Sequence, residues 1–224
     1  MGAVIFILFL GIFIATIYFG ALAAKKRREE LGVLAGRLGL TFEPEKDYSM
    51  ASRYAFLDHL AKGDNRHASN VLRGRQAGHE VMAFDYHYET HSTDSKGRRQ
   101  THHHYFSFFI LLLPRVFPEL TIAREGWASK FAQAFGYDDI DFESAEFSRA
   151  FCVRSKDKRF AYDACNPQMM EYLLANRDLT LEIEAYAVAL AFDTRLSAAG
   201  IEHNLNRLVQ VRALLPEYLF NQTT

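Results

Sequence analysis

The sequence predicts an α+β protein in which an N-terminal transmembrane helix precedes an antiparallel β-sheet domain with a helical insert and a long C-terminal helix. Three observations support this prediction. The first 24 residues contain no charged side chain. Residues 69–113 show the alternation of apolar and polar side chains that is typical of β-strands. Residues 197–220 carry apolar side chains three and four positions apart, as an amphipathic helix does when it covers a core.

Residues 1–24 form the predicted transmembrane anchor, because about 20 apolar residues cross the hydrocarbon core of a bilayer as a helix. Four basic residues follow at once, and the positive-inside rule places them in the cytoplasm, with the N-terminus outside the cell membrane. They are also expected to contact anionic lipid headgroups. The alternative is a signal peptide cleaved at Ala21-Leu22-Ala23. An uncleaved single-pass anchor is favoured because no Lys or Arg precedes the apolar run. The four basic residues are Lys25, Lys26, Arg27 and Arg28.

The rest of the chain divides into three predicted parts. Residues 25–39 continue the helix as a juxtamembrane segment, and residues 40–66 form an irregular linker with a short strand at 40–42 and a short helix at 54–60. Residues 67–222 form a single α+β domain. The formal net charge of −1 gives no field that favours nucleic acid, so no nucleic-acid partner is expected. Cys152 and Cys165 lack the spacing of a redox pair and are expected to be buried as small apolar residues.

Seven strands are predicted in the domain. Residues 69–75 and 80–90 flank a four-residue turn and predict a β-hairpin. A third strand at 101–113 is expected to stop at Pro114, and a fourth covers 120–123. The fifth covers 151–154, and the last two, 179–184 and 188–192, are expected to pair across the turn at 185–187.

Helices are predicted at 126–135, 143–149, 167–176 and 197–220. Asn166 is a good N-cap and Pro167 suits the first helical position, whereas Pro216 is expected to kink the last helix. The order of strands and helices matches a pleckstrin-homology-like barrel, and a plain antiparallel sheet covered by helices is equally compatible.

Histidines are concentrated around the second and third strands, where six of the nine fall between His79 and His104. If residues 91–100 close a hairpin, imidazoles of the two strands lie near one another, and His87 is expected opposite His104. Histidine and carboxylate side chains are zinc ligands, so this region is a candidate metal site. The alternatives are solvated imidazoles or a patch that titrates near neutral pH. The candidate ligands are His87, Glu89, His91, His102 and His104.

Five basic residues on the first strand and in the loop between the second and third strands form a candidate site for the phosphates of anionic lipids. A solvated surface is the alternative. They are Arg73, Arg75, Lys96, Arg98 and Arg99. The sequence contains no GxSxG motif, P-loop or GxGxxG motif, which argues against serine-hydrolase and nucleotide chemistry.

Two blocks of the sequence resemble a known bacterial family. Residues Ala68–Gly74 and Ala83–Thr90 are similar to its "NVL-G … FDY-Y-T" core, and Glu143–Phe151 with Asn166–Glu171 resembles its second block, "ES-EF-R-F … P-MME-L". The family consists of membrane-anchored proteins of unknown function that are frequent in actinobacteria. The resemblance covers nearly the whole chain and implies a place at the membrane, but it brings no catalytic residues.

These observations favour a non-enzymatic interaction module at the membrane surface. Its expected partners are the lipid bilayer and an unidentified protein, with a protein surface or an anionic headgroup as the ligand. The alternative is a metal-dependent enzyme that uses zinc at the strand pair from His87 to His104; no other cofactor is expected.

Overall fold

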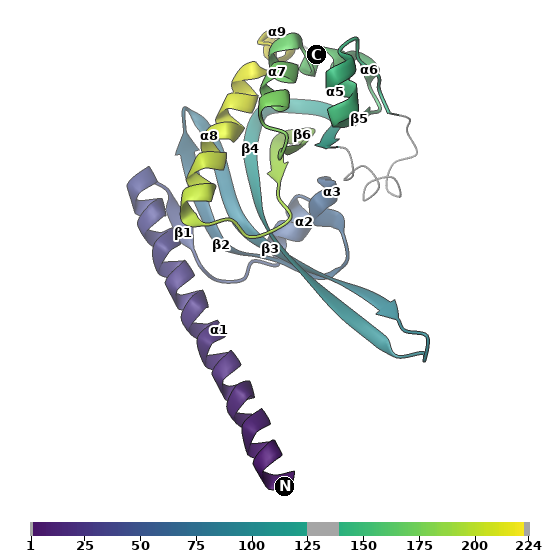
Figure 1. Ribbon diagram of the computed structural model, residues 1–224. Helices are drawn as coiled ribbons and strands as arrows, with labels where there is room; N and C mark the ends of the chain where they lie inside the picture. The colour runs from purple at the N-terminus through teal and green to yellow at the C-terminus, as the bar shows by residue number, and fades with distance from the viewer. Residues whose placement is uncertain (1, 125–138, 222–224) are drawn as a thin grey trace.

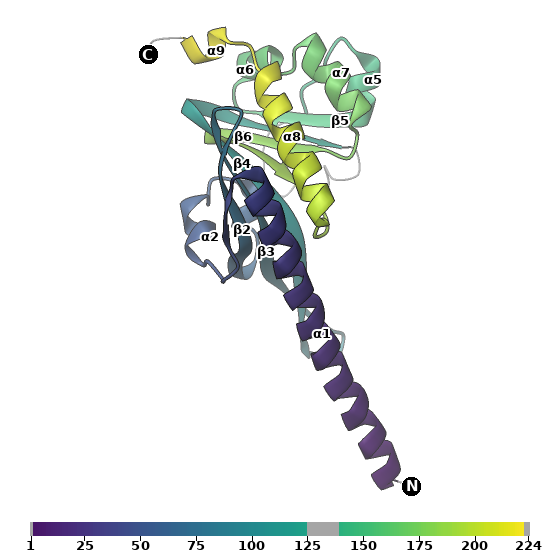
Figure 2. The ribbon, with the colours of Figure 1, turned by 90° about the vertical axis from the view of Figure 1, so that its left-hand side faces the viewer.

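The structure is a computed structural model, and it describes residues 2–124 and 139–221. Its first element, α1 (Gly2–Leu38), is a helix of 37 residues, about 55 Å long at about 1.5 Å per residue. Figures 1 and 2 show its N-terminal half projecting away from the rest of the chain. Large apolar side chains there, such as Phe6, Phe9 and Phe13, are exposed. Ile5–Leu38 is long and apolar enough to cross a membrane, so α1 is a candidate membrane span.

The C-terminal end of α1 is part of the domain core. Leu31, Leu34 and Ala35 are buried, and Gly39, with φ +68°, ends the helix. The Leu40 amide donates to the Ala35 carbonyl at 2.8 Å, and the Gly39 amide to that of Gly36 at 3.3 Å, a Schellman cap that turns the chain back. The hydrophobic core therefore begins inside α1, whereas the sequence predicts that the globular domain begins at residue 67.

Six antiparallel strands form one sheet in the described part of the chain, in the order β1-β2-β3-β4-β5, with β6 also paired to β4. Four of them follow α1 in sequence and two come later. The strands are β1 (Thr41–Glu43), β2 (Asp64–Gln76), β3 (His79–Thr93), β4 (Arg99–Arg124), β5 (Phe151–Ser155) and β6 (Thr180–Ala191). The α+β prediction is confirmed. The seven strands of the pleckstrin-homology-like alternative are not found in these residues, which match the plain covered sheet instead.

Two predicted strand breaks are wrong. β4 continues through Pro114, because the strand has a bulge there. Leu112 pairs with Ala187 and Phe117 with Ala185, so β4 has more residues than β6 between these two pairs. In such a bulge the missing proline N–H costs no ladder hydrogen bond. β6 is one strand and not a hairpin. Ala185 adopts φ +50° opposite the bulge of β4, and the chain continues beyond it in the same direction.

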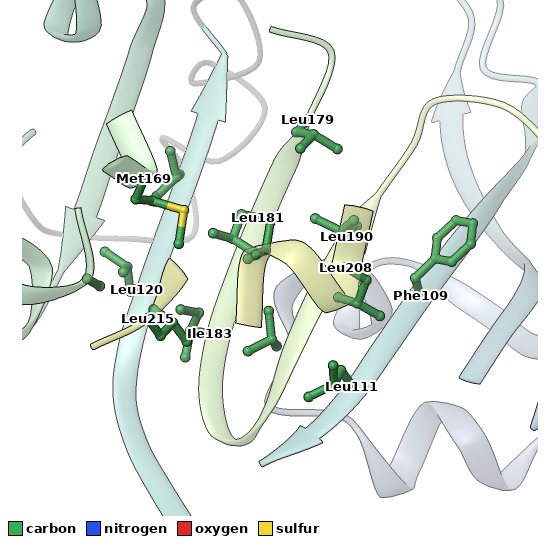
Figure 3. Close-up of a cluster of buried hydrophobic side chains, with 14 of the residues drawn as sticks. Phe109, Leu111, Leu120, Met169, Leu179, Leu181, Ile183, Leu190, Leu208 and Leu215 are labelled. Carbon is green, nitrogen blue, oxygen red and sulfur yellow. The ribbon is translucent and has the colours of Figure 1, made fainter. Parts of the chain in front are cut away.

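Helices cover both faces of the sheet. On one face, α8 and its neighbours enclose the larger core, in which Phe109, Leu181 and Leu208 meet (Figure 3). On the other face, two short helices cover a smaller core that includes Met50, Phe84 and Phe108. The helices of the first face are α5 (Ala145–Ala150), α6 (Lys158–Ala164), α7 (Pro167–Ala175) and α8 (Ala198–Leu214), and those of the second are α2 (Ser49–Arg53) and α3 (Asp58–Ala61).

Several helix predictions are corrected by the structure. One helix is predicted at 54–60, whereas the structure has a turn at 54–57, with α2 before it and α3 after it. The helix α6 is not among the predictions. The C-terminal helix ends at Leu214, and a short α9 (Tyr218–Asn221) follows Pro216. α7 begins as predicted, with the Asn166 side chain accepting from the Met169 amide at 3.0 Å. The helix predicted at 126–135 lies outside the described residues.

The outer ends of β3 and β4 form an arm, residues 89–103, that extends beyond the rest of the sheet. Its tip is closed by Asp94, whose Oδ1 accepts from the amides of Lys96 and Arg98 at 2.8 and 2.9 Å. Figures 1 and 2 both show this β3–β4 arm projecting to the side on which the N-terminal half of α1 lies. The base of the arm and α1 therefore enclose one region of the molecule.

Candidate functional site

A cavity of about 380 Å³ lies where α1 meets the sheet. Ala24 and Arg28 of α1 line one side, and residues of β2, β3 and β4 line the other. Ala24 is the last residue of the uncharged N-terminal stretch, so the cavity lies at the level where the charged part of α1 begins. A larger hollow of about 730 Å³, near Phe142, Pro167 and Tyr218, lies among α6, α7 and α9 and is remote from this level.

An ion pair between Arg27 and Asp85 joins α1 to the sheet at the cavity. Arg27 donates from Nε to Asp85 Oδ2 at 2.7 Å and from Nη2 to Oδ1 at 2.6 Å. Its Nη1 donates to the Leu196 carbonyl at 2.9 Å. Asp85 also accepts from Asn70 Nδ2 at 2.9 Å and from Ser107 Oγ at 3.3 Å. The Asp85 side chain is only 4% exposed, so its charge depends on these donors.

The four basic residues after the apolar stretch therefore have different contacts, which corrects the expectation that all four contact lipid headgroups; their role in membrane topology stays a prediction. Arg27 is engaged by Asp85 and is not available for lipid headgroups. Lys25 and Lys26 are exposed and lie 3.9 and 3.8 Å from Glu29 and Glu30 one helical turn later. Arg28 lines the cavity.

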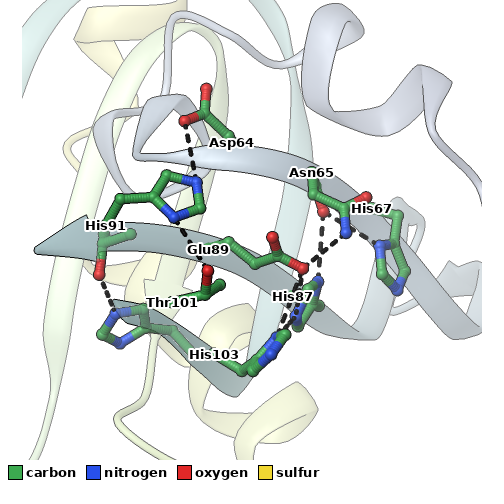
Figure 4. Close-up of polar contacts among 10 residues, drawn as sticks. Asp64, Asn65, His67, His87, Glu89, His91, Thr101 and His103 are labelled. Atoms are coloured by element: carbon green, nitrogen blue, oxygen red, sulfur yellow. Dashed lines mark hydrogen bonds and ion pairs between the residues drawn. The ribbon is translucent and has the colours of Figure 1, made fainter. Parts of the chain in front are cut away.

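Two histidines and a glutamate meet at the base of the arm. Glu89 lies opposite His103, and His87 lies opposite Tyr105, so the side chains share one face of the sheet. His87 Nε2 lies 3.2 Å from His103 Nδ1, and Glu89 Oε1 lies 3.4 Å from His103 Nδ1 and 4.0 Å from His87 Nε2 (Figure 4). These three atoms form a group that could hold a metal ion.

The predicted metal-ligand set is thus only partly brought together. His104 lies opposite Tyr88 on the other face, where the two rings stack at 4.4 Å, so its predicted pairing with His87 is wrong. His102 also lies on that face, with Nε2 2.8 Å from Ser92 Oγ. His91 keeps the face of His87 but lies farther along the arm, 3.7 Å from Asp64 (Figure 4). His103 takes the place that the sequence assigned to His104.

Asn65 orients the cluster from β2. It adopts φ +48° at an irregularity between Asp64 and His67, a conformation that asparagine tolerates better than most residues. Its carbonyl lies 3.2 Å from His87 Nδ1 and 3.3 Å from His67 Nδ1, and its Nδ2 donates to Glu89 Oε1 at 2.7 Å. Asn65 and His67 are not among the predicted site residues, and Asn65 falls in the predicted linker at 40–66.

Burial and hydrogen bonding set the charges of the cluster. Burial lowers the pKa values of His67 and His87, and the hydrogen bond from Asn65 lowers the pKa of Glu89. At neutral pH the two imidazoles are therefore uncharged, next to an ionised carboxylate. Neutral imidazole nitrogens with a free lone pair are able to bind metals or accept hydrogen bonds.

The five basic residues predicted as one ligand site lie at opposite ends of β3. Arg73 and Arg75 are beside the β2–β3 turn, where Arg75 Nη2 donates to the Gly78 carbonyl at 3.2 Å and Arg73 is 3.7 Å from Glu43. The other three lie at the tip of the arm, where Arg98 pairs with Asp94 at 2.9 Å. The prediction of a single patch is wrong; its members at the tip are Lys96, Arg98 and Arg99.

Two other cations line the cavity instead. Lys46 comes from the segment after β1, and Arg195 comes from the segment between β6 and α8, with its guanidinium 4.4 Å from the centre of the Tyr105 ring. Neither carries a sequence signal, because each is a single basic residue in an irregular segment. Their convergence depends on the tertiary fold.

A second group of titratable side chains lies away from the cavity. Burial, reinforced by the charge of Glu119, raises the pKa of Asp58 to about 6 and that of Glu184 to about 7. The imidazole of His59 on α3 and the carboxylate of Glu182 on β6, both buried, are in contact close by. This group makes the stability of the domain sensitive to pH.

Comparison with known proteins identifies a fold and no family. No protein-family model matches the chain, and no curated protein matches it. The resemblance to the actinobacterial family therefore stays a prediction. Among solved structures, the chain is similar to the crystal structure of the mycobacterial trehalose monomycolate transport factor A, TtfA, with a TM-score of 0.59 and 14% sequence identity. The match covers 86% of this chain and 96% of that one, and at this identity it shows a shared fold alone.

Proposed function

We propose that this protein is a non-enzymatic accessory protein of the cell membrane, anchored by α1 with its domain in the cytoplasm, that holds an anionic lipid headgroup in the cavity between α1 and the sheet. The observation that carries the proposal is the position of the cavity. It begins at Ala24, where the uncharged stretch ends, and is lined beyond that point by Arg28.

The length of the uncharged stretch supports a position of the cavity at the membrane surface. Residues 5–24 rise about 30 Å as a helix, which equals the hydrocarbon thickness of a typical bilayer. Ala24 then lies at the edge of the hydrocarbon and Arg28 among the headgroups. The Arg27–Asp85 ion pair holds the sheet against this part of α1, so the open side of the cavity stays next to the lipid surface.

The charges of the cavity suit an anion. Its lining includes four cationic side chains and two carboxylates, a net formal charge of +2 with neutral histidines, whereas the whole chain has −1. Arg27 and Asp85 neutralise each other, which leaves Arg28, Lys46 and Arg195 to attract a phosphate. A basic residue near an anionic membrane surface contributes about 1 kcal/mol to binding.

The fold likeness supports an accessory role at the membrane. The similar structure belongs to a protein named as a transport factor for trehalose monomycolate, and we extend to this chain only the class of role, a factor that assists a membrane process. We also propose an unidentified protein partner for this role. The sequence motifs of hydrolases and nucleotide enzymes are absent, which agrees with a role without catalysis.

Native mass spectrometry of the full chain, released from nanodiscs of mixed phosphatidylcholine and phosphatidylglycerol, tests the proposal. We expect phosphatidylglycerol to be retained preferentially, and the variant Arg28→Gln/Lys46→Gln/Arg195→Gln to lose that preference. The matched control is Arg53→Gln/Arg75→Gln/Lys158→Gln, which removes three exposed cations outside this cavity and should retain it. Equal retention by the two triple variants would refute headgroup binding in the cavity.

A further inference from the structure

We infer that His87, Glu89 and His103 form a binding site for a divalent transition metal ion of the zinc class. The ligand atoms are His87 Nε2, Glu89 Oε1 and His103 Nδ1, which all lie within 4.8 Å of one another. The inference rests on the geometry of the three side chains and does not require that a lipid headgroup binds nearby.

The distances between the three atoms match those around a tetrahedral ion. Zinc binds imidazole nitrogen and carboxylate oxygen at about 2.0–2.1 Å, so two ligand atoms of one tetrahedron are roughly 3.4 Å apart. The observed separations from His103 Nδ1 are 3.2 Å to His87 and 3.4 Å to Glu89. Only the separation between His87 and Glu89, 4.0 Å, must shorten, and a glutamate side chain can close it by rotation.

The site is held by a rigid framework. Glu89 and His103 are directly opposed in the ladder between β3 and β4, and His87 precedes Glu89 by two residues on the same face. A metal site built on paired strands requires little reorganisation when the ion arrives. A shift by one residue would place His102 or His104 opposite Glu89 and would turn the buried side chains of β4 to the other face, so the burial of β4 selects His103.

Asn65 supplies the supporting contacts that metal sites usually have. Metal-bound histidines commonly donate their second ring N–H to a carbonyl or carboxylate, which fixes the tautomer and aims the free nitrogen at the ion. The Asn65 carbonyl is placed to accept from His87 Nδ1 at 3.2 Å, and that contact leaves the His87 Nε2 lone pair directed to the cluster. The Asn65 amide nitrogen also holds Glu89 Oε1 at 2.7 Å (Figure 4).

Three protein ligands leave a fourth position for an exchangeable ligand. The side chains of His87 and Glu89 are 7% and 17% exposed, whereas that of His103 is 51% exposed, so the group is open on the side of His103. The three residues also line the cavity described above, which gives an exchangeable ligand access to the group. Nitrogen and oxygen ligands in this arrangement suit Zn²⁺ and related ions and not Ca²⁺ or Mg²⁺, which prefer oxygen alone.

Metal binding is tested with the full chain in nanodiscs, purified without a polyhistidine tag and stripped with a chelator. Zn²⁺ is then added and unbound metal is removed, and the bound amount is measured by elemental analysis. Co²⁺ is used in parallel, because its visible absorption reports tetrahedral coordination. We expect roughly one ion per chain, since one three-ligand group is present in the described residues.

The variants separate this site from other histidines. His103→Ala and Glu89→Gln should reduce bound metal severalfold and abolish the tetrahedral Co²⁺ spectrum, and Asn65→Ala should weaken affinity about 10–100-fold. His104→Ala, on the opposite face of the same strand, is the control and should bind as the unaltered chain does. Circular dichroism confirms that each variant is folded. Less than a tenth of an equivalent on the unaltered chain, or equal binding by His103→Ala and His104→Ala, would overturn the inference; the cluster would then be a hydrogen-bonded histidine pair.

Discussion

Replacing Arg27 by alanine leaves the Asp85 carboxylate buried against α1 without its cation. Breaking a buried ion pair from one side costs about 3–5 kcal/mol. Asp85 keeps the donors Asn70 and Ser107, and the Arg27 side chain is 18% exposed, so the lower end of that range applies, about 3 kcal/mol. In a chain of this size, 1 kcal/mol corresponds to about 2–4 °C in Tm, so we expect Arg27→Ala to lower Tm by about 6–12 °C.

The assay is thermal unfolding of the full chain in detergent micelles, followed by far-ultraviolet circular dichroism. Arg28→Ala removes a neighbouring cation that has an exposed side chain and should change the free energy of unfolding by less than about 0.5 kcal/mol. Arg27→Ala/Asp85→Asn removes the buried charge and should recover a large part of the loss. A Tm of Arg27→Ala equal to that of Arg28→Ala would refute the conclusion that this pair clamps α1 to the sheet.

Two further predictions concern the carboxylates and a glycine. Because burial raises the pKa of Asp58 to about 6 and of Glu184 to about 7, the folded chain binds protons that the unfolded chain has lost, and their contribution to the free energy of unfolding falls as pH rises through that range. Glu184→Gln should therefore gain stability over the unaltered chain between pH 5 and pH 8, measured as the difference in Tm; a constant difference would contradict the raised pKa. Gly63→Ala should severely reduce the yield of folded protein, because Gly63 has φ +63° and a Cβ there would lie 2.2 Å from the Glu89 carbonyl oxygen. Gly36→Ala, where nothing lies within 4 Å, should fold normally, and similar melting of the two variants would show that this contact is relaxed easily.

The sequence predicts correctly those parts of the fold that depend on interactions between residues close in sequence. The length of the apolar stretch indicated the helix that became α1, and Asn166 with Pro167 marked the start of α7 because both act on the first helical turn. The two wrong strand breaks have a tertiary cause. Pro114 ends a strand only where a ladder hydrogen bond is required, and the conformation of Ala185 depends on the bulge in its partner strand. Neither is visible in the sequence around it.

The candidate site was predictable only in part, for a similar reason. Period two placed His87 and Glu89 on one face, but the choice between His103 and His104 depends on the register across the tip of the arm. Arg27 lies 58 residues from Asp85 in sequence and reads there as one member of a topology signal. The cations Lys46 and Arg195 come from irregular segments that only the folded chain brings to the cavity.

Photocrosslinking in native membranes tests whether the cavity between α1 and the sheet receives a lipid headgroup. Benzoylphenylalanine is placed at Tyr105, which is 46% exposed and lines the cavity, and for comparison at Tyr162, which is 52% exposed and lies outside it. After irradiation, adducts on the purified chain are identified by mass spectrometry. We predict an anionic lipid adduct at position 105 and none at position 162. The absence of lipid at position 105, or the same lipid adducts at both positions, would contradict headgroup binding in this cavity.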